Sequence, residues 1–247
     1  MTGPVTWTCA VAAVVMSALT QSQESLLRRS DIGGFAPSSF RAVLHLTRPP
    51  QATHSIEMWR SGDAKTLIRF LGPREKGRYL LRLGEQLWFV SSSAKKPVRV
   101  GASYRLYGSA TLDEVLGVRL AQAYDVESVA PEPGAGGASV VFSLRARAEG
   151  VLFPRVRYVV HEATARPISA TYRLRSGRDA TTVEFLEWSS GSALYARRLV
   201  VRDHLRNGAV TQVDVVELEA RTVPDALFSL EDATGRRALE ASGGRTP

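Results

Sequence analysis

The chain alternates between apolar and polar residues over most of its length, with a period of two. Phe40, Ala42, Leu44 and Leu46 recur at every second position, and the residues between them are mostly polar. A β-strand points successive side chains to opposite faces of its sheet, so this pattern predicts a strand with one buried face. The alternation returns in the segments 56–58, 68–70, 79–90, 140–144, 156–160, 168–174, 183–185, 199–201 and 210–218.

Short turn signals separate these segments. Pro49-Pro50, Gly72-Pro73 and Gly84 interrupt the first strands, and Asn207-Gly208 is a strong hairpin signal between two later ones. Many short strands joined by such turns are typical of an antiparallel meander. We therefore predict a mainly β (α+β) fold in which about ten strands form a strongly curved antiparallel sheet.

Two segments have helical rather than strand spacing. In Thr111–Ala123 the apolar residues recur three or four positions apart, and Thr111 and Glu114 have the spacing of a capping box. We expect this helix to cross one opening of the sheet. A shorter helix is predicted for Ser25–Asp31, which Gly33-Gly34 would end.

The apolar faces of the strands predict the interior of the domain. A curved antiparallel sheet either fills its interior with side chains or leaves a cavity, and the periodicity does not separate a filled core from a hollow one. The candidate lining residues of such a cavity are Leu44, Met58, Phe70, Tyr79, Leu81, Phe89, Leu116, Phe142, Tyr158 and Tyr172.

The amino-terminal residues predict export. Val5–Leu19 carries no charged residue, and its length of roughly 15 residues matches the apolar core of a signal peptide and is short for a membrane-spanning helix. We predict a signal peptide in residues 1–22, with cleavage near Ala18 or Ser22. A buried amino-terminal helix or an uncleaved anchor is the alternative.

Removal of this signal would leave the chain without a thiol. Cys9 is the only cysteine and lies inside the apolar run, so disulfides, cysteine nucleophiles and cysteine-based zinc sites are excluded from the processed protein. The domain must then be stabilised by its own apolar core. We predict a single domain over residues 23–235 and a frayed tail over residues 236–247.

The formal net charge is +8, and most of the cations are arginines. A basic face would hold the protein near anionic lipid headgroups or an acidic partner. Alternatively, the arginines are spread singly along the polar faces of strands, as the spacing of Arg41, Arg69 and Arg82 favours. No nucleic-acid-binding motif accompanies the charge, so nucleic acid is not an expected partner.

The sequence contains no pattern typical of a catalytic or cofactor site. His45, His54, His161 and His204 are far apart in the sequence, and no HExxH, GxSxG, GxGxxG or P-loop motif occurs. The consecutive acids Asp113-Glu114 suit the start of a helix. We therefore expect no metal, no cofactor and no enzymatic activity.

Four segments match, in order, segments of one known protein family. Leu26–Phe40 resembles an opening helix that ends at an aspartate before the first strand, and Phe70–Trp88 contains F-x-x-P, Lys-Gly and Leu-Trp elements. Gly108–Leu116 resembles a Gly-Ser segment, and Val223–Phe228 resembles a closing Pro–Phe ending. With these segments the chain resembles the outer membrane lipoprotein-sorting proteins, the LolA/LolB-like family of periplasmic carriers.

The resemblance implies an incomplete β-barrel with one to three helices as a lid over an apolar cavity. It implies a soluble, monomeric periplasmic carrier that binds acyl chains of lipoproteins or related lipids for outer-membrane sorting. The implied partners are an inner-membrane transporter and an outer-membrane receptor, with transient membrane contact. The alternative is a non-catalytic periplasmic sensor or envelope-complex subunit that uses the same fold to bind a protein partner.

Overall fold

The protein is built around one large antiparallel sheet. The structure is a computed structural model and describes residues 20–31, 37–91, 96–101, 104–111, 119–134, 137–190, 194–231 and 236–237. Thirteen strands form the sheet in the order β6-β5-β4-β3-β2-β1-β15-β14-β13-β12-β11-β10-β9, and two more strands form a separate pair, β7-β8. Every strand pairing in both sheets is antiparallel.

The helices are α1 (Gln21–Arg29) and α3 (Leu120–Ala123), with the 3₁₀ turns η2 (Pro73–Glu75), η3 (His204–Arg206) and η4 (Asp225–Phe228). The first strands are β1 (Ser39–Thr47), β2 (His54–Ser61), β3 (Lys65–Phe70), β4 (Arg78–Leu83), β5 (Gln86–Ser91), β6 (Val98–Val100), β7 (Arg105–Tyr107) and β8 (Ala110–Thr111). The later strands are β9 (Tyr124–Gly134), β10 (Gly137–Ala146), β11 (Arg155–His161), β12 (Pro167–Arg173), β13 (Asp179–Trp188), β14 (Ala196–Asp203) and β15 (Ala209–Ala220).

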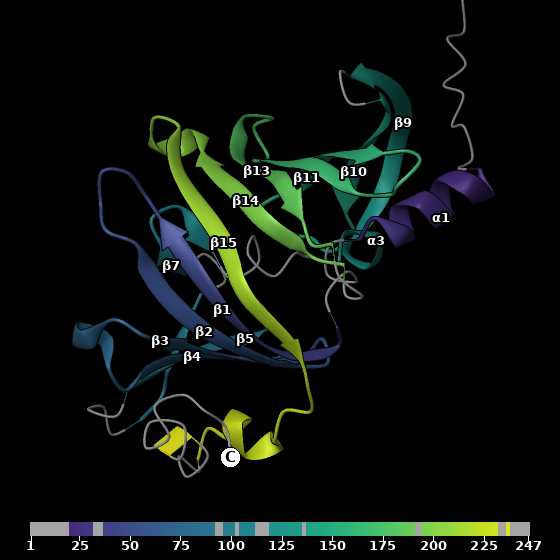
Figure 1. Ribbon diagram of the computed structural model, residues 1–247. Coiled ribbons are helices and arrows are strands. Elements are labelled where there is room, and N and C mark those ends of the chain that lie inside the picture. Colours follow the sequence, from purple (N-terminus) through teal and green to yellow (C-terminus); the bar gives the residue numbers. More distant parts are fainter. Residues whose placement is uncertain are drawn as a thin grey trace, which may run out of the picture.

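The sheet is strongly curved and does not close. β6 and β9 are its two edges, and the half that contains β2–β5 lies across the half that contains β10–β14 (Figure 1). α1 and α3 lie beside β9 and β10. The predicted fold class, a mainly β antiparallel sheet that forms an incomplete barrel, is confirmed. Within the described part of the chain, neither helix has the length and apolar character needed to span a membrane.

The predicted alternation is clearest in β1, where Phe40, Ala42, Leu44 and Leu46 are buried and the residues between them are partly exposed. These four side chains face the concave inner side of the sheet. There they join the main core, whose buried members come from both halves of the sheet and from α1 and α3. The Asn-Gly hairpin is also confirmed, because Asn207 adopts a left-handed conformation between β14 and β15.

The middle strands of the first half are buried on both faces. Ile68 and Leu80 are paired on the inner face, whereas Leu67 and Leu81 are paired on the outer face. The outer residues belong to a second cluster, which the carboxy-terminal segment covers. Its buried members are Trp59, Leu67, Tyr79, Leu81, Val90, Val223, Leu227 and Phe228.

This second cluster corrects one expectation. Tyr79 and Leu81 do not share a face with Met58 and Phe70, as the alternation in β4 suggested. They lie on the opposite side of the sheet, and Leu80 takes the inner position instead. The reason is that consecutive residues of β4 are apolar and both faces are covered, so the period of two does not identify the inner face.

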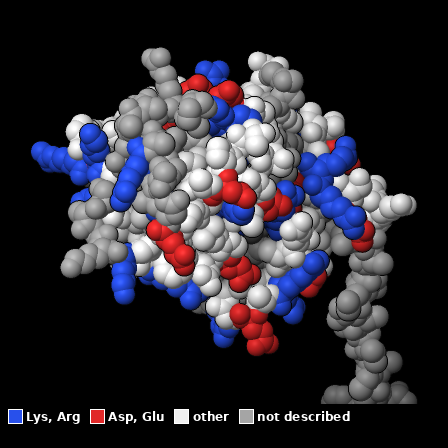
Figure 2. Space-filling model, turned by 90° about the horizontal axis from the view of Figure 1, so that it is seen from below, with Lys and Arg blue, Asp and Glu red and all other residues white. Residues whose placement is uncertain are grey.

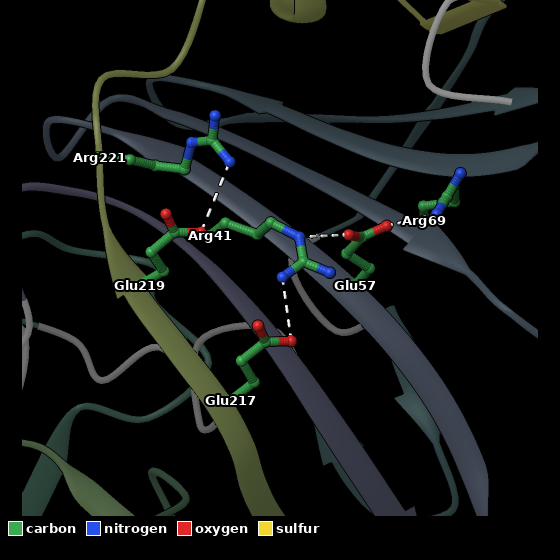
Figure 3. A network of polar contacts seen from close by, with 6 residues as sticks. All are labelled: Arg41, Glu57, Arg69, Glu217, Glu219 and Arg221. Carbon is green, nitrogen blue, oxygen red and sulfur yellow. Dashed lines mark hydrogen bonds and ion pairs between the residues drawn. The ribbon is translucent and has the colours of Figure 1, made fainter. Parts of the chain in front are cut away.

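A buried ion network lies on the same outer face (Figure 3). The Glu57 carboxylate accepts hydrogen bonds from Arg41, at 2.6 Å, and from Arg69, although the Glu57 side chain is only 1% exposed. Arg41 also pairs with Glu217 of β15 at 3.0 Å, and the Arg69 guanidinium lies over the Trp59 ring. The network therefore connects β1, β2, β3 and β15 beside the second cluster.

The two helices are held together by the residues that follow α1. The Thr20 side chain and Gln23 form a capping box, so α1 begins earlier than the predicted Ser25. The Asp31 carboxylate accepts hydrogen bonds from the backbone N–H groups of Leu120 and Ala121, at 3.1 and 3.3 Å. Residues 112–118 of the predicted Thr111–Ala123 helix lie outside the described residues; Leu120–Ala123 is helical, and Thr111 belongs to β8.

Candidate functional site

The concave side of the sheet holds a pocket of about 790 Å³ that is open to solvent on one side. Its apolar lining comes from Leu87, Ala123, Tyr124, Ala146, Ala148, Val151, Leu152, Phe153, Tyr172, Leu174 and Leu205. Its polar lining comes from Arg82, Glu85, Arg105, Ser109, Thr111, Gln122, Arg147, Thr181 and Asp203. Pockets of roughly 300–1,000 Å³ with mostly apolar walls are typical of small-molecule binding sites.

The connection between β10 and β11 forms one wall. It contains Gly150 and ends at Pro154, and its Phe153 turns inward, where its ring lies 5.5 Å from that of Tyr172. The Phe153 carbonyl accepts a hydrogen bond from the Tyr124 hydroxyl at 3.0 Å. These two contacts tie the connection to β9 and β12, so it forms a fixed wall of the pocket.

The β7-β8 hairpin forms the opposite wall. Gly108, at its tip, has a φ of +56°, and a Cβ there would lie 2.5 Å from the Thr211 hydroxyl of β15. The Thr211 hydroxyl also accepts a hydrogen bond from the Ser109 backbone N–H at 2.9 Å. A glycine is therefore required for the hairpin to approach β15 this closely, and the approach places Ser109 and Thr111 against the pocket.

Asp203 is the buried carboxylate of the site, with a side chain that is 2% exposed. It accepts a hydrogen bond from the Arg105 guanidinium at 2.9 Å and from the Leu205 backbone N–H at 2.9 Å. The pair connects the β7-β8 hairpin to the end of β14. The Asp203 charge is therefore compensated within the lining, which also carries Arg82, Glu85 and Arg147.

The exposed part of the pocket lining is mixed: it includes the polar residues Glu85, Gln122 and Arg147 and three large apolar residues. Leu152 is 55% exposed, Leu205 is 43% exposed and Val151 is 37% exposed, and all three line the pocket. Large apolar side chains at the opening of a concave site are typical of a surface that meets an apolar ligand or an interface.

Of the ten residues expected to line a cavity, Tyr172 lines this pocket. Leu44, Met58, Phe70, Phe142 and Tyr158 are buried in the main core, and Phe89 is partly buried against it. Tyr79 and Leu81 lie in the second cluster, and Leu116 lies outside the described residues. The main core thus draws residues from both halves of the sheet, and the pocket lies beside it, lined by residues of both halves.

Tyr158 is a fully buried residue of the main core that also contacts the end of α1. Its hydroxyl donates a hydrogen bond to the Ser30 carbonyl at the end of α1. Burial raises the pKa of the Tyr158 phenol above its ordinary value, so the group stays neutral and remains a donor. The residue anchors α1 to the sheet.

The pocket residues that sequence reasoning missed lie mainly outside strands. Val151, Leu152 and Phe153 form an apolar run inside a turn, between Gly150 and Pro154, and Leu205 lies in η3. An apolar run within a turn was the available signal, because turn residues are usually polar. Among the described residues, no group of three or more His, Cys, Asp or Glu side chains is placed to hold a metal ion.

Comparison with known proteins finds one matching family model and several solved structures with a similar fold. A family model described as "-like: Uncharacterized protein" matches residues 62–232, whereas no curated protein matches the sequence. A LolA superfamily protein from Nitrosomonas europaea is 22% identical, with a TM-score of 0.73, and the match covers 84% of this chain and 97% of that one.

Two further solved structures agree. A DUF1329 family protein from Desulfovibrio piger is 17% identical, with a TM-score of 0.69 and coverage of 84% and 96%. A putative outer membrane lipoprotein-sorting protein domain from Vibrio parahaemolyticus is 15% identical, with a TM-score of 0.69 and coverage of 84% and 95%. The chain therefore belongs to the family of the model that matches residues 62–232, and its fold is that of the LolA-like lipoprotein-sorting proteins.

Proposed function

We propose that the protein is a non-catalytic periplasmic carrier that binds the acyl chains of lipoproteins or related lipids in the pocket on its concave side. The observation that carries the proposal is the volume of about 790 Å³, whose accessible lining is mostly apolar and includes the exposed side chains of Val151, Leu152 and Leu205. The expected export signal and the LolA-like fold support the periplasmic location and the role in outer-membrane sorting.

The physical chemistry of acyl chains suits this pocket. Each methylene group contributes about 0.8 kcal/mol when it moves from water into an apolar site. Such burial needs no directional contacts, which agrees with the internal pairing of Arg105 and Asp203. A carrier of this kind binds by area and shape, and it needs neither a nucleophile nor a cofactor.

The test is to express the chain with its amino terminus intact in a Gram-negative host and purify it without detergent. Bound lipid would then be extracted and identified by mass spectrometry. We expect acyl lipid at near one equivalent per chain. Recovery of none, together with no uptake of a fluorescent fatty acid, would contradict the proposal.

A pair of variants on one strand locates the binding. Ala146 lines the pocket, whereas Ala138, on the same strand β10, is exposed and lies away from it. Ala146→Phe would fill part of the pocket and should lower the recovered lipid severalfold. Ala138→Phe should leave it unchanged, and thermal unfolding of both variants would show that they are folded.

A second candidate function is the binding of a protein partner through β9. This strand of eleven residues pairs only with β10 among the described strands, so its other edge is available for strand addition. A smaller pocket of about 350 Å³ lies between α1 and this edge, lined in part by Leu26, Val129 and Pro131. Lipid-free protein that purifies with a stoichiometric partner would favour this candidate.

A further inference from the structure

The connections between strands are basic at one end of the strands and acidic at the other end. One set of connections lies at the end of the sheet where β1 ends and β2 begins. It consists of the connections 48–53, 71–77, 147–154, 174–178 and 204–208, with residues 96–97. We call them the basic rim. Within the described residues they hold eight arginines and lysines and two glutamates, Glu75 and Glu149.

The connections at the opposite end of the strands contain more acidic than basic residues. The described ones are 62–64, 84–85, 162–166 and the described residues between β13 and β14. They contain the acids Asp63, Glu85 and Glu162 and one cation, Arg166. The described connections between strands therefore carry their charge asymmetrically along the strand direction.

Ion pairing explains why the excess cations lie in the rim. On the strands, arginines are matched with acids of neighbouring strands: Arg145 pairs with Glu127 at 2.6 Å, and Arg157 pairs with Glu132 at 2.6 Å. The face shown in Figure 2 accordingly has basic and acidic groups interspersed. Cations on the strands are thus largely neutralised locally.

The rim differs in this respect. Arg175 and Arg178, in the connection between β12 and β13, are exposed, as are Arg74 and Lys76 in the connection between β3 and β4. None of these four makes an ion pair with a described residue. Their charges face solvent, where they are available to an anionic surface.

The rim also contains the exposed apolar residues that line the pocket. Leu152 lies in the connection between β10 and β11, and Leu205 lies in the turn between β14 and β15, with Arg206 beside it. Figure 1 shows the β14–β15 turn and the β1–β2 connection at the upper left of the molecule. Arg206 pairs with Asp203 at 4.0 Å, so the unpaired cations of the rim are those of the connections 71–77 and 174–178. Exposed leucines and unpaired cations at the same end of the strands are the composition of a surface that binds at the lipid–water interface.

We infer that the basic rim docks the protein on a bilayer that contains anionic phospholipid, with Leu152 and Leu205 entering the headgroup region and the pocket mouth facing the membrane. The cations supply long-range attraction, and the leucines supply apolar contact. The purpose of docking rests on the proposed function, because a carrier must present its pocket to a bilayer to load or release a lipid. The docking itself requires only the rim.

The size of the effect follows from the charges. A basic residue near an anionic membrane surface increases binding about fivefold, as converted from roughly 1 kcal/mol per residue. Reversal of two rim cations should therefore weaken binding at least 25-fold, an order-of-magnitude figure on the same basis. The binding should also weaken as salt is added, since the interaction is screened over about 10 Å at 0.1 M ionic strength.

The experiment is flotation of the purified chain with large unilamellar vesicles. Vesicles of pure phosphatidylcholine are compared with vesicles that contain about 30 mol% phosphatidylglycerol, a charge density that gives a negative surface potential. The rim variant is Arg175→Glu/Arg178→Glu. The matched control is Arg29→Glu/Arg197→Glu, which changes the net charge equally at exposed positions on α1 and β14.

A second pair of variants tests insertion of the leucines. Leu152 and Leu186 are each 55% exposed, but Leu186 lies on β13 and does not line the pocket. Each is replaced by Cys in a chain with Cys9→Ala and labelled with an environment-sensitive fluorophore. The label at Leu152→Cys should shift to the blue on addition of anionic vesicles, and the label at Leu186→Cys should not.

The outcomes are distinct from those of the lipid-extraction test. Selective binding to anionic vesicles that the rim variant loses and the control keeps supports the inference, even where no lipid is recovered from the pocket. Equal binding by the rim variant and its control overturns it. Absence of vesicle binding, or binding to an acidic protein without binding to vesicles, also overturns it and leaves the pocket proposal standing.

Discussion

The two halves of the sheet differ in how their outer faces are covered. β2, β3 and β4 are buried on both faces, by the main core on the inner side and by the carboxy-terminal segment on the outer side. On the outer face of β10 and β13 most positions are polar or at least partly exposed, although Ser139 and Ala180 are buried. The first half is therefore packed on both faces, whereas the pocket on the inner side is lined by residues of both halves.

This contrast suggests that the first half contributes the larger share of the packing. A carrier must keep an apolar cavity open without collapse, and the loss of packing there has to be offset by packing elsewhere. The second cluster and the buried ion network supply that packing on the far side of the first half. Variants on the outer face should therefore affect stability more in the first half than in the second, and variants around the pocket should affect ligand binding most.

The largest expected effect comes from the cover of the second cluster. Phe228 is 4% exposed and packs on the outer face. Phe228→Ala should lower the free energy of unfolding by about 3–5 kcal/mol, the usual cost of removing a buried aromatic ring. Urea denaturation measures it, with Leu186→Ala on the uncovered outer face of β13 as a control that should change stability by less than about 0.5 kcal/mol.

The buried ion network should be almost as sensitive. Glu57→Gln leaves Arg41 and Arg69 without their shared carboxylate and should cost about 3–5 kcal/mol. Glu219 pairs with Arg221 on the surface and is about half exposed, so Glu219→Gln should cost no more than about 1 kcal/mol. Equal effects of the two changes would show that the Glu57 network is not the buried element described above.

The neighbouring residues Leu80 and Leu81 test double coverage directly. Leu80→Ala and Leu81→Ala should each cost about 2–5 kcal/mol, because the two side chains are buried on opposite faces. In β10, Leu144→Ala should cost as much, whereas Val141→Ala, at a partly exposed outer position, should cost less than about 1.5 kcal/mol. A small effect for Leu81→Ala would contradict the covered outer face.

The anchor of α1 should contribute less. Tyr158→Phe removes the hydroxyl that donates to the Ser30 carbonyl and should destabilise the protein by about 1–3 kcal/mol, since a buried acceptor is left without its partner. Hydrogen exchange would show faster exchange in α1 than in the sheet. Uniform acceleration throughout the chain would instead indicate that the change disturbs the whole core.

The smallest predicted effect depends on pH. Burial alone would raise the pKa of Asp63, but the guanidiniums of Arg119 and Arg60 outweigh it and hold that pKa below its ordinary value. The stabilisation is therefore present above about pH 4, the unfolded pKa, and is lost as pH falls through the lower folded pKa. Asp63→Asn should cost under about 1 kcal/mol at neutral pH, because the side chain is 54% exposed, and the difference should vanish in acid.

The sequence predicted the fold from local signals. The alternation in β1 and the Asn-Gly turn before β15 each depend on residues close in the chain, and both are confirmed. The inner face of β4 was not predictable in this way. Its outer residues Tyr79 and Leu81 are buried by Val223–Phe228, which is distant in sequence, and periodicity carries no information about that cover.

A cavity was among the expectations from the sequence, but its position was not predicted. Strand periodicity directed attention to Leu44, Met58 and Phe70, which the structure packs into the core. The walls of the pocket come largely from a turn and a small hairpin, where residues have no regular period. Whether a concave face is filled or hollow depends on how distant segments meet, as Phe153 and Tyr172 do.

The most direct test of the account is photocrosslinking with a fatty acid that carries a diazirine near the end of its acyl chain. Labelled peptides from the folded chain would be mapped by mass spectrometry. The account predicts labels on pocket residues such as Ala146, Phe153, Tyr172 and Leu174, and their loss in Ala146→Phe. Labels confined to the second cluster around Trp59 and Phe228, or labels that excess unmodified fatty acid does not displace, would contradict it.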